Sequence, residues 1–207
     1  GVLAGKRADD AWNQRFADYD FYDAKGVVEE LLDSLRITKV RFKPVDAEEY
    51  AFLQPGRAAE VLAGGELIGW VGNIHPRALR AVDIDVPVVA FELSLAALLR
   101  LAHDELPYED VPTLPGVEVD LALVVDESVT YEQLMQRISS AGGKLLAEAH
   151  LFDVYRDEKR VGAGKKSMAF SLTYRAADHT LTSEEVEKVH NKLVTKLTRG
   201  LGAEVRS

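Results

Sequence analysis

The pattern of apolar and polar positions is clearest in residues 151–175, LFDVYRDEKRVGAGKKSMAFSLTYR. From Ser167 onward, apolar side chains alternate with small or polar ones over eight residues, which is typical of a β-strand with one buried face. The expected inward set is Met168, Phe170, Leu172 and Tyr174, and the expected outward set is Ser167, Ala169, Ser171 and Thr173. Small polar side chains on the second face predict a sheet that is covered on one side only.

A shorter alternating run, residues 151–155, precedes this strand, with Gly162 and Gly164 between the two, so the stretch predicts a β-hairpin. In the first run we expect Phe152 and Val154 to point inward, and Leu151, Asp153 and Tyr155 to point outward. An aromatic side chain on an uncovered sheet face is a suitable surface for stacking an unpaired nucleic-acid base.

Two predicted helices flank the hairpin, and each begins with a capping-box pattern, Thr130 with Gln133 and Thr182 with Glu185. Glycines come where each helix is expected to end. Short apolar runs complete the unit as strands, at residues 119–125 and 203–206. The order strand, helix, strand, strand, helix, strand predicts a ferredoxin-like βαββαβ domain with both helices on one face of an antiparallel sheet.

The first half of the chain has a different pattern. Apolar side chains at 3- and 4-residue steps predict a helix that begins at Asp23 or Tyr22, with an inner face of Val27, Val28, Leu31, Leu32 and Leu35. Strands are expected at 2–4, 39–42, 60–62, 67–71 and 88–93, and short helices at 76–82 and 95–101. This order predicts an α+β fold with an antiparallel sheet. Prolines after residue 106 predict a boundary between domains 1–110 and 113–207.

Composition adds limits. The 207 residues are 47% hydrophobic and 29% charged, which is ordinary for one large or two small globular domains. The absence of cysteine excludes disulfides and thiolate chemistry and favours a reducing compartment. No apolar run approaches the roughly 18 residues of a membrane span, so we expect no membrane association and a cytoplasmic location. Because the chain begins without methionine or a signal pattern, we expect a fragment of a longer protein.

The net charge of −9 argues against wholesale nucleic-acid binding, but it is unevenly distributed. Residues 1–112 carry −8 and residues 113–207 only −1. The second part also holds a basic cluster at Arg156, Lys159, Arg160, Lys165 and Lys166. Such a cluster is either a solvated turn or a set of phosphate contacts.

Catalytic chemistry is not indicated. The five histidines are scattered, and we find no phosphate-binding loop, metal-ligand spacing or Ser/His/Asp grouping, so neither a catalytic residue nor a metal site is expected.

Arg57, in the run QPGR, comes after a Pro-Gly turn, and we expect it to form a salt bridge with nearby carboxylates. Trp70 and Phe91 are expected in a core or an interface.

These motifs resemble a known family. The runs DFYDAKGVVEELL (20–32), FLQPGRAAEVLAGGELIGWVGNIHPRAL (52–79) and VVAFELSLAALL (88–99) resemble the core of the β subunit of bacterial phenylalanyl-tRNA synthetase. The runs DLALVV (120–125), AGGKLLAEAHLFDVYR (141–156), GKKSMAFSLTYRAADHTLTSEEV (164–186) and LGAEVR (201–206) resemble its C-terminal ferredoxin-fold anticodon-binding domain.

The resemblance implies an (αβ)2 heterotetramer that joins phenylalanine to its tRNA with ATP and Mg²⁺. In that family the α subunit is the catalytic, class II subunit, and the β core is similar to a class II synthetase fold without the catalytic residues. The segment at hand is then non-catalytic, with phenylalanine-specific tRNA and the α subunit as its partners. An exposed apolar patch on residues 1–100 is expected if this surface packs on α.

The resemblance also implies which residues read the first anticodon base. Ala122, Tyr155 and Arg206 match the family's positions: Ala122 leaves room for guanine, Tyr155 stacks on it, and Arg206 or Asp120 contacts a polar edge or a phosphate. Asp153 is a candidate acceptor for guanine N–H groups, and Lys165, Lys166 and Arg156 are candidate phosphate contacts. The alternative for Tyr155 is a half-buried strand tyrosine without an RNA role.

Two departures from the family pattern are visible. Gln54 stands where the family commonly has histidine, and Glu118 and Val119 precede Asp120 where an arginine is common. Two other functions stay open: a non-enzymatic ferredoxin-like domain that binds a small regulatory molecule, and a pure assembly domain, neither of which contacts RNA.

Overall fold

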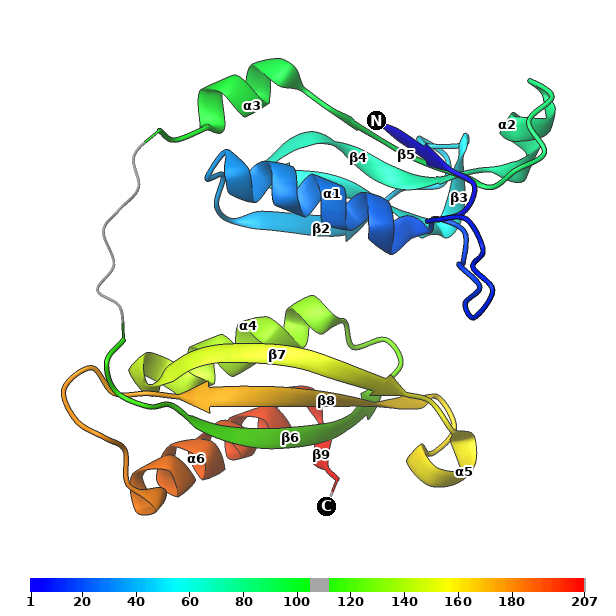
Figure 1. Cartoon of the computed structure of the whole chain (residues 1–207). Coiled ribbons are helices and arrows are strands. Elements are labelled where there is room, and N and C mark those ends of the chain that lie inside the picture. Colours follow the sequence, from blue (N-terminus) through cyan, green and yellow to red (C-terminus); the bar gives the residue numbers. More distant parts are fainter. Residues whose placement is uncertain (105–111, 207) are drawn as a thin grey trace. The chain divides into compact units, whose positions relative to one another are not determined.

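The computed structural model describes residues 1–104 and 112–206, and these two ranges form two compact units (Figure 1). Both units are built of helices and antiparallel sheets, which confirms the predicted α+β class. The boundary predicted around Pro107 lies outside the described residues, so the domain limits stay a prediction. No helix in the described ranges combines the length and apolar character needed to cross a membrane.

The first unit is a five-stranded antiparallel sheet in the order β1-β5-β4-β3-β2. Its elements are β1 (Val2–Ala4), α1 (Phe21–Ser34), β2 (Val40–Pro44), β3 (Leu53–Ala63), β4 (Glu66–Ile74), α2 (Pro76–Arg80), β5 (Val88–Leu93) and α3 (Leu95–Leu101). The predicted hairpin joins β3 and β4 through Gly64 and Gly65, whose φ angles of 60° and 90° favour glycine. Both strands are longer than the periodicity indicated.

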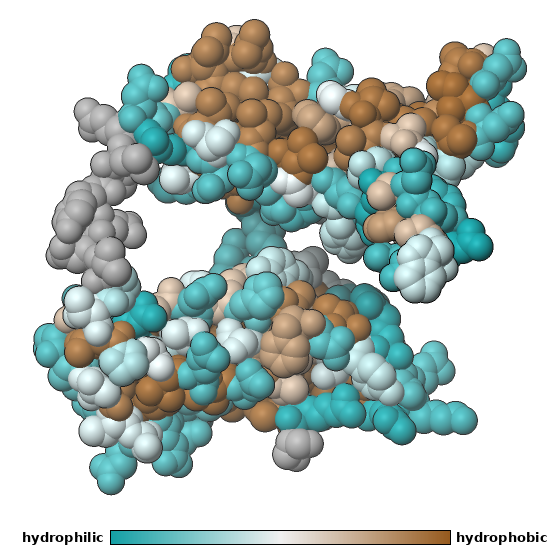
Figure 2. Space-filling model, viewed as in Figure 1, coloured by the Kyte–Doolittle hydropathy of each residue, from teal (hydrophilic) through white to brown (hydrophobic). Residues whose placement is uncertain are grey.

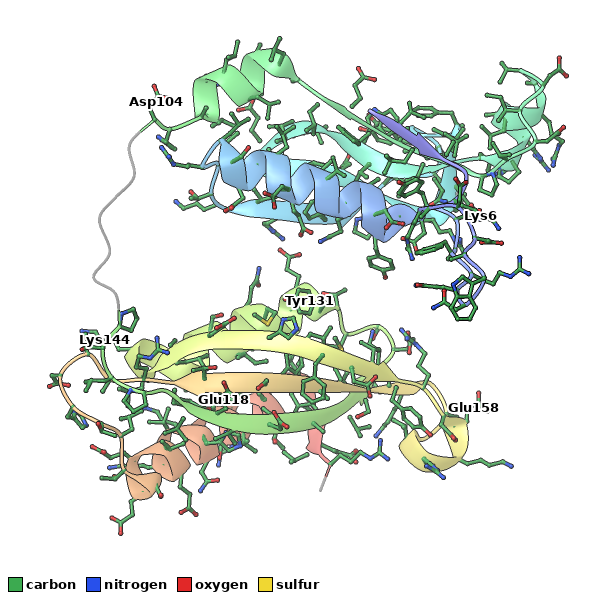
Figure 3. The ribbon with its side chains drawn as sticks, viewed as in Figure 1. Lys6, Asp104, Glu118, Tyr131, Lys144 and Glu158 are labelled. Carbon is green, nitrogen blue, oxygen red and sulfur yellow. The ribbon has the colours of Figure 1, made fainter. Side chains whose placement is uncertain are left out.

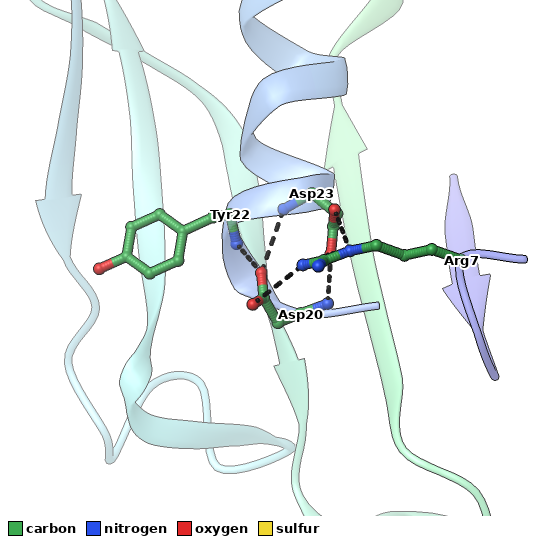
Figure 4. A network of polar contacts seen from close by, with 4 residues as sticks. All are labelled: Arg7, Asp20, Tyr22 and Asp23. Atoms are coloured by element: carbon green, nitrogen blue, oxygen red, sulfur yellow. Dashed lines mark hydrogen bonds and ion pairs between the residues drawn. The ribbon is translucent and has the colours of Figure 1, made fainter. Parts of the chain in front are cut away.

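Helix α1 begins earlier than predicted because Asp20 caps it. The Asp20 side chain accepts from the Tyr22 and Asp23 backbone N–H groups, and the Asp23 side chain accepts from the Asp20 N–H (Figure 4). Arg7 ties the loop after β1 to this cap, with its Nη2 2.8 Å from Asp23 Oδ2. These hydrogen bonds favour the charged form, so the pKa of Asp23 is lowered, chiefly by Arg7.

The inner face of α1 differs slightly from the expected stripe. Ala24, Val28 and Leu32, at 4-residue steps, are buried in the core of the first unit. Val27 is 45% exposed, so the prediction that it points inward is wrong. Ala24 completes a buried stripe with Val28 and Leu32, and Val27, about 100° from Val28 around the helix, lies outside it.

The second unit is a four-stranded antiparallel sheet in the order β7-β8-β6-β9. Its elements are β6 (Val117–Asp126), α4 (Tyr131–Gly142), the 3₁₀ turn Gly143–Leu145, β7 (Leu146–Tyr155), α5 (Glu158–Val161), β8 (Lys165–Tyr174), α6 (Ser183–Leu201) and β9 (Glu204–Val205). This order and pairing confirm the ferredoxin-like prediction. The predicted turn between β7 and β8 holds the short helix α5, which the sequence pattern did not indicate.

Helices α4 and α6 pack on the same face of this sheet (Figure 1). Both predicted capping boxes are present, with Thr130 Oγ1 accepting from the Gln133 N–H and Thr182 Oγ1 from the Glu185 N–H. The core joins the inner residues of both helices to alternate residues of the strands, among them Leu134, Ile138, Leu193, Leu197, Leu121, Leu123, Phe170 and Leu172. The predicted inward set of β8 is buried in full.

Strand β7 does not alternate as expected, because its pairing with β8 shifts between Leu151 and Asp153. Leu151 lies opposite Phe170 and packs on the core, whereas Tyr155 lies opposite Ser167 on the other face. The predictions that Leu151 points outward and that Phe152 points inward are therefore wrong, and Phe152 is 54% exposed. A β-bulge adds one residue to a strand and thereby reverses the facing of the later residues in that strand.

A partly buried pair lies where α6 packs on the sheet. Tyr174 and His190 approach within 3.2 Å, Oη to Nδ1, and burial raises the pKa of Tyr174 to about 12. Burial also lowers the pKa of His190 below its ordinary 6.5, because an imidazolium would lose solvation there. The exposed His179 has the opposite shift, since Asp178 and then Glu185 raise its pKa.

We predict that the two histidines titrate in opposite directions from 6.5, His190 below and His179 above, in an NMR titration of their imidazole protons. Because His190 is harder to protonate when folded, it stabilises the fold above pH 6.5, and this contribution is lost as the pH falls through its folded pKa. His179 stabilises the fold below 6.5 and loses this effect as the pH rises through its own folded pKa. A His190 pKa above that of His179 would contradict this structure.

Thr182→Ala should destabilise the second unit by about 1 kcal/mol, because it removes the cap of α6. The matched control is Thr195→Ala in the same helix, where Thr195 Oγ1 donates to the Asn191 carbonyl and alanine is a better helix former. Urea denaturation followed by NMR reads the second unit separately. Equal losses in both variants would show that the cap has no special role.

Candidate nucleic-acid interface

The helices leave one face of the second sheet uncovered, and we call it the open face. Its residues are Asp120, Ala122 and Val124 on β6; Ser167, Ala169, Ser171 and Thr173 on β8; and Asp153 and Tyr155 on β7. The register aligns them in rows across the sheet, Asp153–Ala169–Ala122 and Tyr155–Ser167–Val124. Most of these side chains are small, as the alternation in β8 predicts.

Tyr155 is held at one end of the open face. Its hydroxyl donates to Asp157 Oδ2 at 3.0 Å. The other oxygen of Asp157 accepts from the backbone N–H groups of Lys159 and Arg160 and so caps helix α5. One carboxylate therefore fixes both the short helix and the tyrosine ring, which limits the side-chain freedom that a stacking surface would lose on binding.

Arg206 reaches the same place from the far edge of the sheet. Its backbone N–H donates to the Ala122 carbonyl at 2.9 Å, and its guanidinium carbon lies 5.4 Å from the centre of the Tyr155 ring, within cation–π range. Strands β8 and β6 separate the two residues, so their side chains meet above Ala122 and Ser167. Ser167 is consequently only 4% exposed, although it lies on the open face.

Carboxylates surround this contact. Asp153 and Asp120 are both exposed and lie opposite Ala169 and Ser171 of the central strand. Glu118 lies further along the same face, opposite Thr173 (Figure 3). A carboxylate accepts hydrogen bonds and repels phosphate. The middle of the open face therefore suits the N–H groups of a base better than a nucleic-acid backbone.

Two of the three predicted phosphate contacts are accessible to solvent but paired with carboxylates. Arg156 donates from Nη2 to Glu127 Oε1 at 2.8 Å, and Lys165 Nζ lies 2.8 Å from Glu204 Oε1. Arg156 lowers the pKa of Glu127, and Glu204 raises the pKa of Lys165. Exposed pairs of this kind contribute about 0–1 kcal/mol, so a phosphate can compete for either cation.

Lys166 is placed differently. It lies opposite Val125, on the helix-covered face, and is 8% exposed. Its Nζ donates to the Glu127 backbone carbonyl at 2.9 Å and lies 3.8 Å from Glu127 Oε1. This placement argues against the phosphate contact expected of Lys166, because a ligand would first have to break these interactions. The alternation of β8 already assigns Lys166 to the inward set.

The sequence reasoning missed three carboxylates that organise the site: Asp157, Glu127 and Glu204. The role of Asp157 could have been predicted from the nearby sequence, because aspartate is a common N-cap residue. Its side chain accepts from backbone N–H groups two and three residues later, here those of Lys159 and Arg160. Glu127 and Glu204 are 29 and 39 residues from their partners Arg156 and Lys165, and their pairing depends on strand register.

A one-sided ferredoxin-like sheet that carries an anchored aromatic residue and an arginine has the features on which some RNA-binding domains stack unpaired bases. Residues 112–206 match the family model of the ferredoxin-fold anticodon binding domain. Residues 1–95 match the model of the phenylalanyl-tRNA synthetase β chain CLM domain.

Curated relatives agree with both matches. The chain is 38% identical over 205 residues to the phenylalanine–tRNA ligase β subunit of Syntrophotalea carbinolica, covering 99% of this chain and 25% of that protein. It is 41% identical over 206 residues to that of Symbiobacterium thermophilum (100% and 22%) and 42% identical over 198 residues to that of Bacillus licheniformis (95% and 24%). The chain belongs to the phenylalanyl-tRNA synthetase β-chain family, and it spans a quarter or less of the length of these relatives.

The Arg206–Tyr155 contact can be tested without RNA. A ring face shifts nearby protons upfield, so we predict upfield-shifted Arg206 side-chain protons that return to ordinary positions in Tyr155→Leu. Tyr131→Leu is the control, because Tyr131 lies at the start of α4 and stacks on Phe170 instead (Figure 3). Arg206 protons at ordinary positions in the unaltered protein would mean that the contact is not populated.

Proposed function

We propose that this chain is the C-terminal segment of a phenylalanine–tRNA ligase β subunit and that its second unit binds the anticodon of phenylalanine-specific tRNA. The observation that carries the proposal is the open face of a sheet whose other face is filled by α4 and α6. The family matches support an anticodon ligand for this face.

The first anticodon base, guanine, stacks on Tyr155 and lies above Ala122. A stacked base contributes about 1–3 kcal/mol. The guanidinium of Arg206 occupies the same ring face at 5.4 Å, which is too close to admit a base between the two. Arg206 therefore moves when the base enters, and its charge becomes available to the base edge or a phosphate.

Specificity for guanine comes from carboxylate acceptors. Asp153 ends the row that contains Ala122, Asp120 lies in the neighbouring row opposite Ser171, and both are exposed. Guanine presents N1–H and N2–H donors on its Watson–Crick edge, whereas adenine lacks this pair of donors. The flanking bases and their phosphates are directed toward the rim, where Arg156 and Lys165 lie.

We infer that the first unit packs on the catalytic α subunit of an (αβ)2 enzyme that works in the cytoplasm with ATP and Mg²⁺. Large apolar side chains are exposed on this unit, among them Leu95 and Leu99 of α3, Leu67 and Val82 (Figure 2). Large exposed apolar side chains one turn apart on a helix, such as Leu95 and Leu99, favour a protein interface. The non-catalytic role expected of this segment leaves activation of phenylalanine to α.

The experiment is a titration of the 207-residue chain with the anticodon stem-loop of phenylalanine-specific tRNA at low salt, where contacts between cationic side chains and phosphates are strongest. We expect measurable binding that weakens when the first anticodon base is changed to a pyrimidine. Inosine at that position, which lacks the 2-amino group, should bind more weakly than guanine if a carboxylate accepts from that group. The absence of binding would favour the regulatory or assembly function instead, and binding indifferent to this base would mean that the second unit does not read it.

Tyr155→Ala should weaken stem-loop binding about 10- to 100-fold, because it removes the stacking surface. Tyr155→Phe should retain most of the affinity, since it loses only the hydrogen bond to Asp157. In the whole enzyme, Tyr155→Ala should raise the KM for tRNA and leave activation of phenylalanine unchanged. Equal loss of both activities would indicate an assembly role.

A further inference from the structure

A second candidate site lies in the first unit, at one end of its sheet. A cavity of about 350 Å³ is bounded by the ends of β3 and β4, helix α2, and the segment leading into β5. Small-molecule sites have volumes of about 300–1,000 Å³, with apolar walls and a few polar groups. The apolar wall here includes Ile74, Leu79, Ile84, Val86 and Val88, and the polar groups include Arg57, Arg80, Asn73 and Asp85.

The two arginines of the cavity lack carboxylate partners among the described residues. Arg57 was expected to form a salt bridge, yet within residues 1–104 and 112–206 neither Arg57 nor Arg80 has an acidic group within ion-pair distance. Other arginines of this unit, such as Arg7 and Arg100, do pair with carboxylates. Two guanidinium groups on one small cavity attract an anion, and their planar N–H groups suit a carboxylate.

Asn73 indicates that the ligand also carries a hydrogen-bond donor. It lies on β4, is 7% exposed, and its side-chain oxygen has no hydrogen-bond partner in the part of the chain that the structure describes. Buried acceptors are nearly always satisfied, so an orphaned oxygen on a cavity indicates a ligand that brings a donor. Asp85 adds a negative charge to the same lining. The ligand therefore carries a hydrogen-bond donor, preferably a cationic one.

We propose that this cavity binds a free α-amino acid with an apolar side chain. Its carboxylate meets Arg57 and Arg80, its ammonium group donates to Asn73 Oδ1 beside Asp85, and its side chain packs on the apolar wall. A zwitterion matches a lining that holds both charge signs and an unsatisfied acceptor. The inference does not depend on the anticodon role, because the cavity and the open face belong to different units.

The test is an NMR titration of the 207-residue chain, reading the side-chain signals of Asn73, Arg57 and Arg80. The probes are L-leucine, 4-methylpentanoate, which lacks the amino group, and 3-methylbutylamine, which lacks the carboxylate. We expect saturable shifts with L-leucine at a Kd of about 1–10 mM. Each truncated probe should bind at least about tenfold more weakly, since each loses a charged hydrogen bond.

Variants locate the binding. Arg57→Gln and Arg80→Gln should each weaken L-leucine binding about tenfold. The matched control is Arg77→Gln, on the same helix as Arg80 but not on the cavity lining, which should have no effect. Ile84 belongs to the apolar wall, so Ile84→Asn should also weaken L-leucine binding, which provides a second test if an arginine variant does not fold.

Three results would overturn the proposal. The first is the absence of saturable L-leucine shifts at the cavity signals. The second is equal binding of all three probes, which would leave the arginines and Asn73 without a role. The third is saturable binding of inorganic phosphate at Arg57 and Arg80 with no response to L-leucine, which would assign the arginine pair to a different class of anion.

Discussion

A side chain can lie across a β-sheet only where the strands beneath it carry small residues. In the second unit Tyr155 and Arg206 start from opposite edges and meet above Ala122 and Ser167, on strands β6 and β8. Large side chains at these two positions would separate the tyrosine from the arginine. The candidate anticodon site therefore depends first on small residues in the central strands and only then on the aromatic residue itself.

The open face can carry small residues because the hydrophobic core that stabilises the unit lies on the other face of the sheet. The large side chains of β6 and β8 point toward α4 and α6, whose capping boxes fix where the helices start. The bulge at Phe152 completes the arrangement. Leu151 and Tyr155 are four residues apart and would share a face in a regular strand, yet Leu151 packs on the core and Tyr155 lies on the open face. The inserted residue therefore lets Leu151 pack on the core while Tyr155, on the same edge strand, lies on the open face.

Local patterns in the sequence were sufficient for the α+β class, the βαββαβ order, the capping boxes and the outward face of β8, because each depends on residues a few positions apart. Three features that were not predicted correctly depend on residues far apart in the sequence. The bulge in β7, the pairing of Lys165 with Glu204, and the lack of an acidic partner for Arg57 within the described ranges are set by strand register and by packing across the unit. The position of Lys166 could be predicted without knowing the strand register, because the alternation of β8 assigns Lys166 to the helix-covered face.

We expect the first anticodon base to bind the uncovered sheet face and no other surface of the second unit. The most direct measurement is the set of intermolecular nuclear Overhauser contacts between the guanine H8 proton of the stem-loop and the protein. We predict contacts to the Tyr155 ring and the Ala122 methyl group. Contacts to side chains of α4 or α6, with none to Tyr155, would contradict this claim.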